Sequence, residues 1–71
     1  MREDGIPYPN IRNRREDLDL TQAEVAKALN CSQVAYSYYE LGRRDIPTPI
    51  LIELSKIYDC SIDYLLGVSD R

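Results

Sequence analysis

The sequence predicts an all-α domain of five short helices. Apolar residues recur at the three- and four-residue spacing of one helix face, without the strict alternation that is typical of a strand. Residues that tolerate a left-handed backbone are repeatedly followed by serine or threonine, which signals the end of one helix and the start of the next. The connections between helices are about three to six residues long, so consecutive helices are expected to stay in contact.

The chain is expected to form one domain with short flanking ends. A chain of 71 residues is small, and its 44% of hydrophobic residues are enough for a compact helical core. Residues 1–8 are expected to be a flexible arm, because Gly5 and Pro7 interrupt the helical spacing. The domain itself is expected to span residues 9–67, with residues 68–71 as a C-terminal tail.

The first helix is expected at about residues 9–18. Pro9 suits the first turn of a helix, where its missing N–H group has no partner to lose. Ile11, Arg15 and Leu18 then share one face at helical spacing.

Residues 21–29 carry the strongest helix-start signal in the chain. Thr21 can accept a hydrogen bond from the first turn, and Glu24 can reach back to the Thr21 backbone, which together form a capping box. Leu20, just before this cap, is placed to pack on Val25 as a hydrophobic staple. Asn30 tolerates the left-handed conformation of a sharp helix exit.

Another helix, at about residues 32–41, follows after a turn of about three residues. Ser32 caps it and Gly42 ends it, with Tyr36 and Tyr39 expected on its inner face. Two short helices, a tight turn and the small Ala26 at their crossing describe a helix-turn-helix.

The last two helices repeat the same start and stop chemistry. Thr48 is expected to cap the fourth helix, with Pro49 in its first position. Four residues make up its inner stripe: Leu51, Leu54, Ser55 and Tyr58. The segment Asp59-Cys60-Ser61 repeats the chemistry of Asn30-Cys31-Ser32, which predicts a fifth helix at about residues 61–66 that stops at Gly67.

The charge of the chain bears on its partners. A net charge of −3 and a pI of about 4.7 count against a nucleic-acid partner, because such proteins are usually basic. The acidic excess lies in residues 45–71, which carry a net charge of −3, whereas residues 10–44 carry +1. Because the arginines flank the helix-turn-helix, the charge objection weakens without disappearing.

Several other function classes find little support in the sequence. It contains no histidine, no glycine-rich phosphate loop and no nucleophile paired with a base, so neither an enzyme nor a cofactor is expected. Cys31 and Cys60 do not follow metal-ligand spacing and are expected to be small buried residues in a reducing compartment. No apolar run approaches the length of a membrane span, and we expect a cytoplasmic protein. We also expect no small-molecule ligand.

Two stretches of the sequence match a known family in register. The first holds Leu20-Thr21-Gln22-Ala23-Glu24-Val25-Ala26, Ser32-Gln33, Tyr36-Ser37 and Tyr39-Glu40, and the second runs Tyr58-Asp59-Cys60-Ser61-Ile62-Asp63-Tyr64-Leu65-Leu66-Gly67. Over about residues 10–67, the chain resembles the phage-repressor and Cro-like helix-turn-helix family. The resemblance implies a repressor-type regulator that binds double-stranded DNA as a homodimer on a palindromic operator. It would act at the nucleoid of a prokaryotic cell or phage-infected host.

Seven residues are expected to contact DNA. Gln33 leaves the N-terminus of the second motif helix, where a glutamine amide matches N7 and N6 of adenine, and an exposed Val34 would suit a thymine methyl group. Base contacts are expected from Gln33, Val34 and Tyr38, and backbone contacts from Gln22, Ser37, Arg43 and Arg44. The alternative for Val34 is a valine packed in the core, and for the other residues it is a solvated or surface-packed side chain. The Tyr36 hydroxyl is a further candidate for a phosphate contact.

Two structural pairings follow from the resemblance and from the apolar chain end. Arg15 and Glu40 align with a family ion pair that orients the recognition helix more than it stabilises the fold. Four apolar residues are expected to form the interface of a dimer: Ile62, Leu65, Leu66 and Val68. Such a dimer would place its two recognition helices about one DNA turn apart. The alternative is that these four residues only close the core of the monomer.

Two other functions stay open on the sequence. The acidic total and the lack of a basic residue at Tyr38 fit a protein-interaction module of the same fold that does not bind DNA. An antitoxin of a toxin–antitoxin pair, which also binds DNA, is a variant of the main interpretation.

Overall fold

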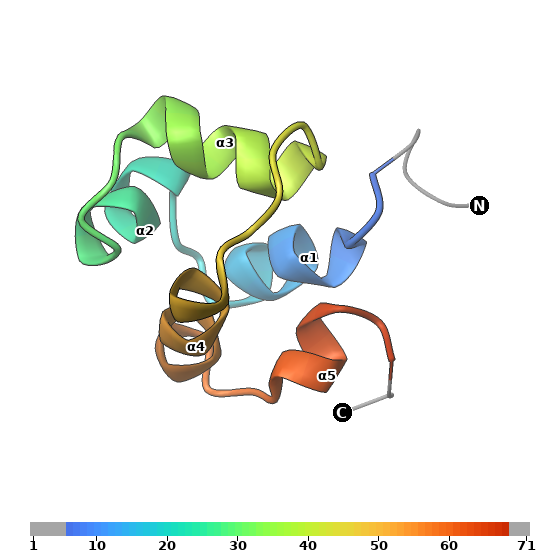
Figure 1. Cartoon of the computed structure of the whole chain (residues 1–71). Coiled ribbons are helices and arrows are strands. Elements are labelled where there is room, and N and C mark those ends of the chain that lie inside the picture. The colour runs from blue at the N-terminus through green and yellow to red at the C-terminus, as the bar shows by residue number, and fades with distance from the viewer. Residues whose placement is uncertain (1–5, 69–71) are drawn as a thin grey trace.

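Five α-helices follow one another in the computed structural model, which describes residues 6–68. They are α1 (Pro9–Asp17), α2 (Gln22–Ala28), α3 (Gln33–Leu41), α4 (Thr48–Ile57) and α5 (Ile62–Leu65). The described part of the chain contains no strand, and the prediction of an all-α fold is confirmed. Figure 1 shows α2 and α3 together at one end and α4 and α5 at the other, with α1 between them.

Three of the helix starts use the predicted side-chain caps. At α2, the backbone N–H of Glu24 donates to Thr21 Oγ1 at 3.1 Å, and the Thr21 N–H donates to Glu24 Oε1 at 2.8 Å. Ser32 and Ser61 cap α3 and α5 in the same way, each accepting at 3.0 Å from the backbone N–H three residues later. Each serine or threonine satisfies an amide that the helix itself leaves without a partner.

The start of α4 differs from the prediction. Thr48 is the first helical residue rather than the cap, and Pro47 takes the cap position without a side-chain hydrogen bond. The Pro47 carbonyl accepts from the N–H groups of Ile50 and Leu51 at 2.9 and 3.0 Å. Because these amides already have a partner, the Thr48 hydroxyl is not needed to cap them.

All five helices end in the same backbone motif. A residue with a positive φ follows the C-cap of α1, α2, α4 and α5 and is itself the C-cap of α3, and in each case the next residue donates to a carbonyl five positions back, as in a Schellman motif. These positive-φ residues are Asp19, Asn30, Gly42, Asp59 and Gly67. The predicted sharp exits at Asn30 and Asp59 are confirmed, with Cys31 N to Ala26 O at 3.0 Å and Cys60 N to Ser55 O at 3.1 Å.

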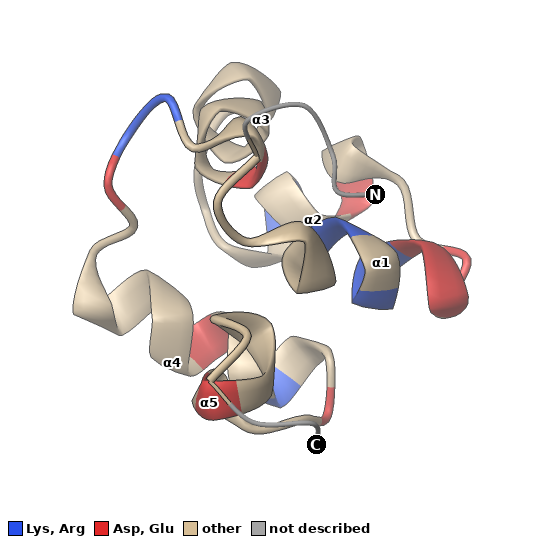
Figure 2. Ribbon diagram, turned by 90° about the vertical axis from the view of Figure 1, so that its right-hand side faces the viewer, with Lys and Arg blue, Asp and Glu red and all other residues tan. Residues whose placement is uncertain are grey.

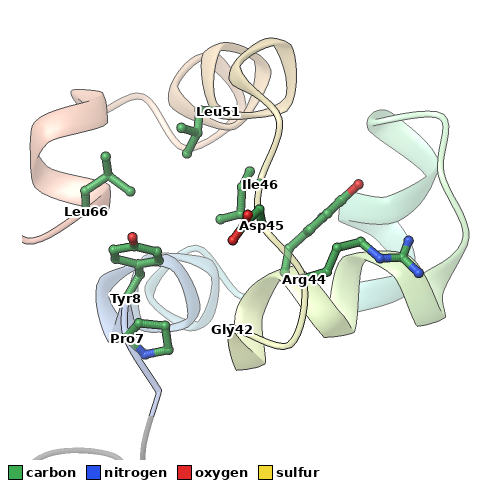
Figure 3. Close-up of a pocket in the computed structure, with 9 residues that line it drawn as sticks. Pro7, Tyr8, Gly42, Arg44, Asp45, Ile46, Leu51 and Leu66 are labelled. Atoms are coloured by element: carbon green, nitrogen blue, oxygen red, sulfur yellow. The ribbon is translucent and has the colours of Figure 1, made fainter.

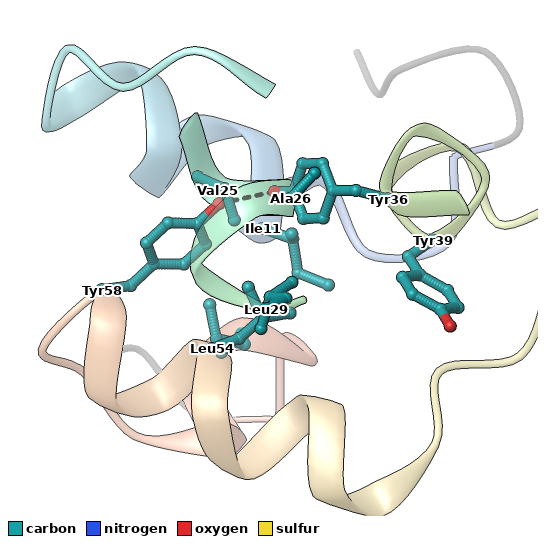
Figure 4. Close-up of a cluster of buried hydrophobic side chains, with 9 residues drawn as sticks. Ile11, Val25, Ala26, Leu29, Tyr36, Tyr39, Leu54 and Tyr58 are labelled. Atoms are coloured by element: carbon teal, nitrogen blue, oxygen red, sulfur yellow. Dashed lines mark hydrogen bonds between the residues drawn. The ribbon is translucent and has the colours of Figure 1, made fainter. Parts of the chain in front are cut away.

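The core lies where the helices meet (Figure 4). Its buried residues are Ile11, Val25, Ala26, Leu29, Tyr36, Tyr39, Leu54, Tyr58 and Leu65. Leu18 was predicted to share the inner face of α1, but it forms the C-cap and is 39% exposed, and Leu20 packs against the core after the turn. Because α1 ends at Asp17, Leu18 does not continue the buried face of the helix.

Polar contacts from α1 connect it to the last two helices. Arg14 Nε donates to the carbonyl of Tyr58 at 2.8 Å, and Asn10 Nδ2 donates to the carbonyl of Tyr64 at 2.8 Å. Both carbonyls lie at or near helix C-termini, where positive or N–H groups are favourable. None of the described helices is long and apolar enough to cross a membrane.

The predicted arm and tail lie largely outside the described residues. These predictions cover residues 1–8 and 68–71, of which residues 1–5 and 69–71 are not described. Within the arm, Pro7 lies directly against Gly42, where its ring occupies the space that a β-carbon would need. Pro7, at the end of the arm next to α1, therefore packs on the domain, while the flexible arm over residues 1–8 stays a prediction.

Candidate nucleic-acid interface

Helix α3 has a buried side and an outward side. Tyr36, Tyr39 and Glu40 are buried, whereas Gln33 is exposed and Val34 is 61% exposed. Ser37 and Tyr38 are half-buried at the edge between the two sides. Because Gln33 is the first residue of α3, its side chain stands at the end of the helix that is best placed to approach DNA.

The Tyr36 hydroxyl does not belong to the outward side. It lies in the core 2.5 Å from the hydroxyl of Tyr58 (Figure 4). The prediction of a phosphate contact from this group is wrong, because the Tyr36 ring is fully buried and its hydroxyl has an internal partner.

An open groove brings five of the predicted contact residues together. It has a volume of about 400 Å³ and is lined by Gln22, Gln33, Val34, Ser37 and Tyr38. All five side chains are uncharged, and four of them offer hydroxyl or amide groups with donor and acceptor capacity at this groove. Gln22 comes from the start of α2, so the groove joins the two helices of the motif.

The two remaining predicted residues, Arg43 and Arg44, lie in the connection between α3 and α4. Figure 2 shows this basic loop at the end of α3, and acidic residues on α4 and α5. The guanidinium carbon of Arg44 lies over the ring of Tyr38, 5.5 Å from its centroid. This contact was not predicted from the sequence, and it brings a positive charge to the edge of the uncharged groove.

Glu40 joins three helices behind the groove. Its carboxylate accepts from Arg15 Nε at 2.6 Å and from Gln22 Nε2 at 3.1 Å, and Arg15 Nη1 also donates to the Leu20 carbonyl at 2.9 Å. Burial lowers the pKa of Arg15, but the hydrogen bond and charge of Glu40 outweigh burial, so this pKa is raised above its usual value. Arg15 and Glu40 thus lie as an ion pair, at the positions where the family pattern led us to expect one.

The Gln22–Glu40 bond is a contact that the sequence did not reveal. Gln22 was expected from the sequence to contact the DNA backbone. In this chain, Gln22 shares the Glu40 carboxylate with Arg15. The sequence signal for this bond would have been a polar residue at the start of α2, Gln22, together with an acidic residue on α3, Glu40.

The predicted dimer face is changed at one position. Leu65 is fully buried in the core, so its side chain offers no surface to a second copy. Ile62 and Leu66 are half-buried, and Val68 is 73% exposed. The apolar surface at this end of the chain therefore consists of Ile62, Leu66 and Val68, while Leu65 closes the monomer.

The two cysteines are half-buried and pack against the core. Burial raises the pKa of Cys31 and of Cys60, which favours the protonated form of both thiols. Among residues 6–68, no three His, Cys, Asp or Glu side chains are grouped as a metal site would need.

A second cleft, of about 420 Å³, lies on the other side of Arg44 (Figure 3). Its lining residues are Pro7, Tyr8, Tyr39, Gly42, Arg44, Asp45, Ile46, Leu51 and Leu66. Figure 3 shows Pro7 and Tyr8 on one side of it and Leu66 and Leu51 across from them. Arg44 thus borders this cleft while its guanidinium lies over Tyr38 of the groove.

Together, the packed α2–α3 pair, the exposed start of α3 and the groove beside it define a helix-turn-helix protein. The chain belongs to the helix-turn-helix family, whose family model matches residues 11–65.

Relatives of the chain include regulators of bacteria and of a phage. It is 42% identical over 57 residues to the uncharacterized HTH-type transcriptional regulator YqaE of Bacillus subtilis (strain 168), which covers 80% of this chain and 49% of YqaE. It is 41% identical over 56 residues to the repressor protein C2 of Salmonella phage P22, covering 79% of this chain and 26% of that repressor. The chain thus spans about half the length of YqaE, and less of the phage repressor.

A solved structure of that repressor has the same fold. The crystal structure of the P22 c2 repressor in complex with synthetic operator 9T has a TM-score of 0.75 to this chain, with 39% sequence identity. The match covers 83% of this chain and 89% of the repressor chain.

Proposed function

We propose that this chain is the sequence-specific DNA-binding domain of a transcriptional regulator that acts as a repressor. The observation that carries the proposal is the groove between α2 and α3, where Gln22, Gln33, Val34, Ser37 and Tyr38 converge. The relatives named as transcriptional regulators and the repressor structure with an operator support it. Such a regulator is not an enzyme and would work at the DNA, in the cytoplasm.

In this proposal α3 lies in the major groove. Gln33 and Val34 meet base edges, a glutamine amide being suited to adenine and an apolar side chain to the thymine methyl group. Tyr38 completes the base-facing set further along the helix. Gln22 and Ser37 meet the DNA backbone beside them, together with Arg43 and Arg44 from the loop. The electrostatic attraction to the phosphates comes from these two arginines, because the groove residues are uncharged.

We further propose that two copies bind a palindromic operator. The apolar surface of Ile62, Leu66 and Val68 offers a patch that two identical chains can share about a two-fold axis. A two-fold dimer would set two recognition helices about one DNA turn apart, which matches two half-sites of an operator.

Selecting bound duplexes from a random DNA pool tests this function. A palindromic consensus is expected, with half-sites about one helical turn apart. A single asymmetric site would keep sequence-specific binding and overturn the dimer. If neither the pool nor any duplex binds even at low salt, the DNA-binding proposal is wrong.

A protein-interaction module without DNA binding is the second candidate, favoured by the net charge of −3. Salt dependence separates the two, because binding through several phosphates weakens steeply from low to moderate salt. An antitoxin would share that salt dependence, and a partner toxin encoded beside it would identify that variant.

A further inference from the structure

We propose that Tyr38 is a positioning residue whose ring holds Arg44 over the edge of the groove, where the guanidinium meets a DNA phosphate. This inference rests on the proposed DNA-binding function. It replaces the base contact proposed above for Tyr38 with a role through Arg44, which does not need the Tyr38 hydroxyl. The Arg44 guanidinium carbon lies 5.5 Å from the centroid of the Tyr38 ring.

The backbone explains why these two residues meet. Gly42 ends α3 with a φ of +76°, and the N–H of Arg43 donates to the Tyr38 carbonyl at 2.9 Å. This bond turns the chain back over the last turn of α3, the turn that carries Tyr38. Arg44, one residue further along, is thereby delivered next to the Tyr38 ring.

Two physical effects favour this position of Arg44, and a third favours binding from it. The face of an aromatic ring attracts a cation, and arginine is the cation most often found there. The C-terminal end of α3 carries a partial negative charge, which also favours a nearby guanidinium. An arginine that is held before binding loses less side-chain freedom when it meets a phosphate.

The groove itself shows why the position matters. Its five lining residues, Gln22, Gln33, Val34, Ser37 and Tyr38, are all uncharged. Tyr38 is the one among them that contacts Arg44 in this way, so the ring is the link between the groove and the basic loop. A tyrosine at this place supplies no charge of its own, but it fixes the charge that comes from Arg44.

A set of four variants separates the contributions of Tyr38 and Arg44 to DNA binding. Tyr38→Phe keeps the ring and removes the hydroxyl, Tyr38→Leu removes the ring, Arg44→Ala removes the cation, and Tyr38→Leu/Arg44→Ala combines the last two. Binding is measured against the selected duplex and a random duplex of equal length, from low to moderate salt. Lys56→Ala is the control for loss of one positive charge, since Lys56 is exposed on α4 and pairs with Glu53 at 3.6 Å.

Tyr38→Leu is expected to weaken binding about two- to fivefold on both duplexes, the range of an exposed cation–π contact. Tyr38→Phe, which keeps the ring, is expected to bind both duplexes nearly as tightly as the wild type. Arg44→Ala is expected to lower the salt slope by about one unit, and Lys56→Ala to leave it unchanged. In the Arg44→Ala background, removal of the ring is expected to cause no further loss.

An NMR measurement on the free protein provides a readout that does not depend on DNA. The side-chain protons of Arg44 are expected to be shifted upfield by the Tyr38 ring, and to lose this shift in Tyr38→Leu but keep it in Tyr38→Phe. Absence of the shift in the wild type, or additive losses in the double variant, overturns the inference while DNA binding stands. A Tyr38→Phe variant as weak as Tyr38→Leu also overturns it, because the hydroxyl would then make the contact. Failure of the wild type to bind either duplex at low salt overturns the proposed function, and the inference with it.

Discussion

Gln22 donates a hydrogen bond from Nε2 to Oε1 of Glu40 at 3.1 Å, and the other oxygen of this carboxylate accepts from Arg15 Nε at 2.6 Å. A carboxylate only accepts, so Glu40 determines that the nitrogen end of the Gln22 amide faces it. The amide oxygen of Gln22 therefore faces away from the carboxylate. One buried carboxylate thus connects α1, α2 and α3 and orients a residue of the groove.

Glu40→Ala is expected to destabilise the protein by about 2–4 kcal/mol, because it leaves the Arg15 charge without its partner inside the fold. The value stays below that of a fully buried pair because the Arg15 side chain is 12% exposed, whereas Glu40 is 2% exposed. Urea denaturation measures the free energy of unfolding. Glu16→Ala is the matched control, since Glu16 lies 3.9 Å from Arg15 but is 60% exposed, and its loss is expected to cost less than about 1 kcal/mol.

The same pair predicts a non-additive double variant. Arg15→Met/Glu40→Met is expected to cost less than the sum of its single variants, because neither buried charge then remains unpaired. Single-variant losses that simply add in the double variant would contradict the role of this ion pair.

Gln33→Ala is expected to weaken binding to the selected duplex by about 1–3 kcal/mol and to relax the preference at one base pair, as the loss of a bidentate base contact does. Gln22→Ala is the matched comparison, since both glutamines line the groove but Gln22 is assigned to the backbone. It is expected to weaken all sequences about equally. Titration of both variants against the selected duplex and single-base-pair substitutions of it measures the difference. A uniform loss for Gln33→Ala would move Gln33 to the backbone contacts.

The buried tyrosine pair predicts a loss of stability at alkaline pH. Burial raises the pKa of Tyr58 to about 12, and burial together with the bond to Tyr58 raises the pKa of Tyr36 further. Both hydroxyls stay protonated in the folded state while the unfolded chain loses these protons above about pH 10. The stabilisation is therefore complete below about pH 10 and falls as pH rises, by about 1.4 kcal/mol per pH unit for each group.

Urea denaturation at a series of pH values from neutral to alkaline measures this slope. Tyr58→Phe removes one titrating group, so its stability is expected to fall less steeply above about pH 10 than that of the wild type. At neutral pH the same variant is expected to cost about 1–2 kcal/mol, because the Tyr36 hydroxyl loses its partner in the core. Parallel pH curves for the two proteins would show that the pair does not cause the alkaline loss.

Much of the fold was predictable because its signals are local. The caps at Thr21, Ser32 and Ser61 act on residues three positions away, and the turns at Asn30 and Asp59 need only a residue that tolerates a positive φ. The cap at Thr48 was wrong although its signal is equally local. There the Pro47 carbonyl competed for the same amides, and a list of residue preferences does not resolve that competition.

The site divides in the same way. The two sides of α3 follow from helical spacing, so the outward position of Gln33 and Val34 could be predicted. The partner of Gln22 and the stacking of Arg44 on Tyr38 could not, because each depends on which of several reachable groups a long side chain contacts. That choice is made by the packing of three helices and by the path of a loop.

Gly42 and Gly67 form a matched pair that separates backbone strain from steric crowding. Both end a helix with nearly the same positive φ, +76° and +78°. An added β-carbon at Gly67 meets open space, whereas at Gly42 it meets the ring of Pro7. Each alanine variant is expected to cost about 1 kcal/mol for the left-handed conformation.

Gly42→Ala is expected to cost distinctly more than Gly67→Ala, because the Pro7 ring must move away from the end of α3. Urea denaturation of both variants measures the difference, and Pro7→Ala/Gly42→Ala tests its cause. Removing the ring is expected to bring the further cost of Gly42→Ala, measured in the Pro7→Ala background, close to that of Gly67→Ala. Equal losses for the two single variants would mean that Pro7 is not held against Gly42 in solution.

The loop that carries Arg44 is directed by the turn at Gly42 and not by Pro7. Pro7→Ala is therefore expected to leave DNA binding unchanged, measured below its unfolding temperature.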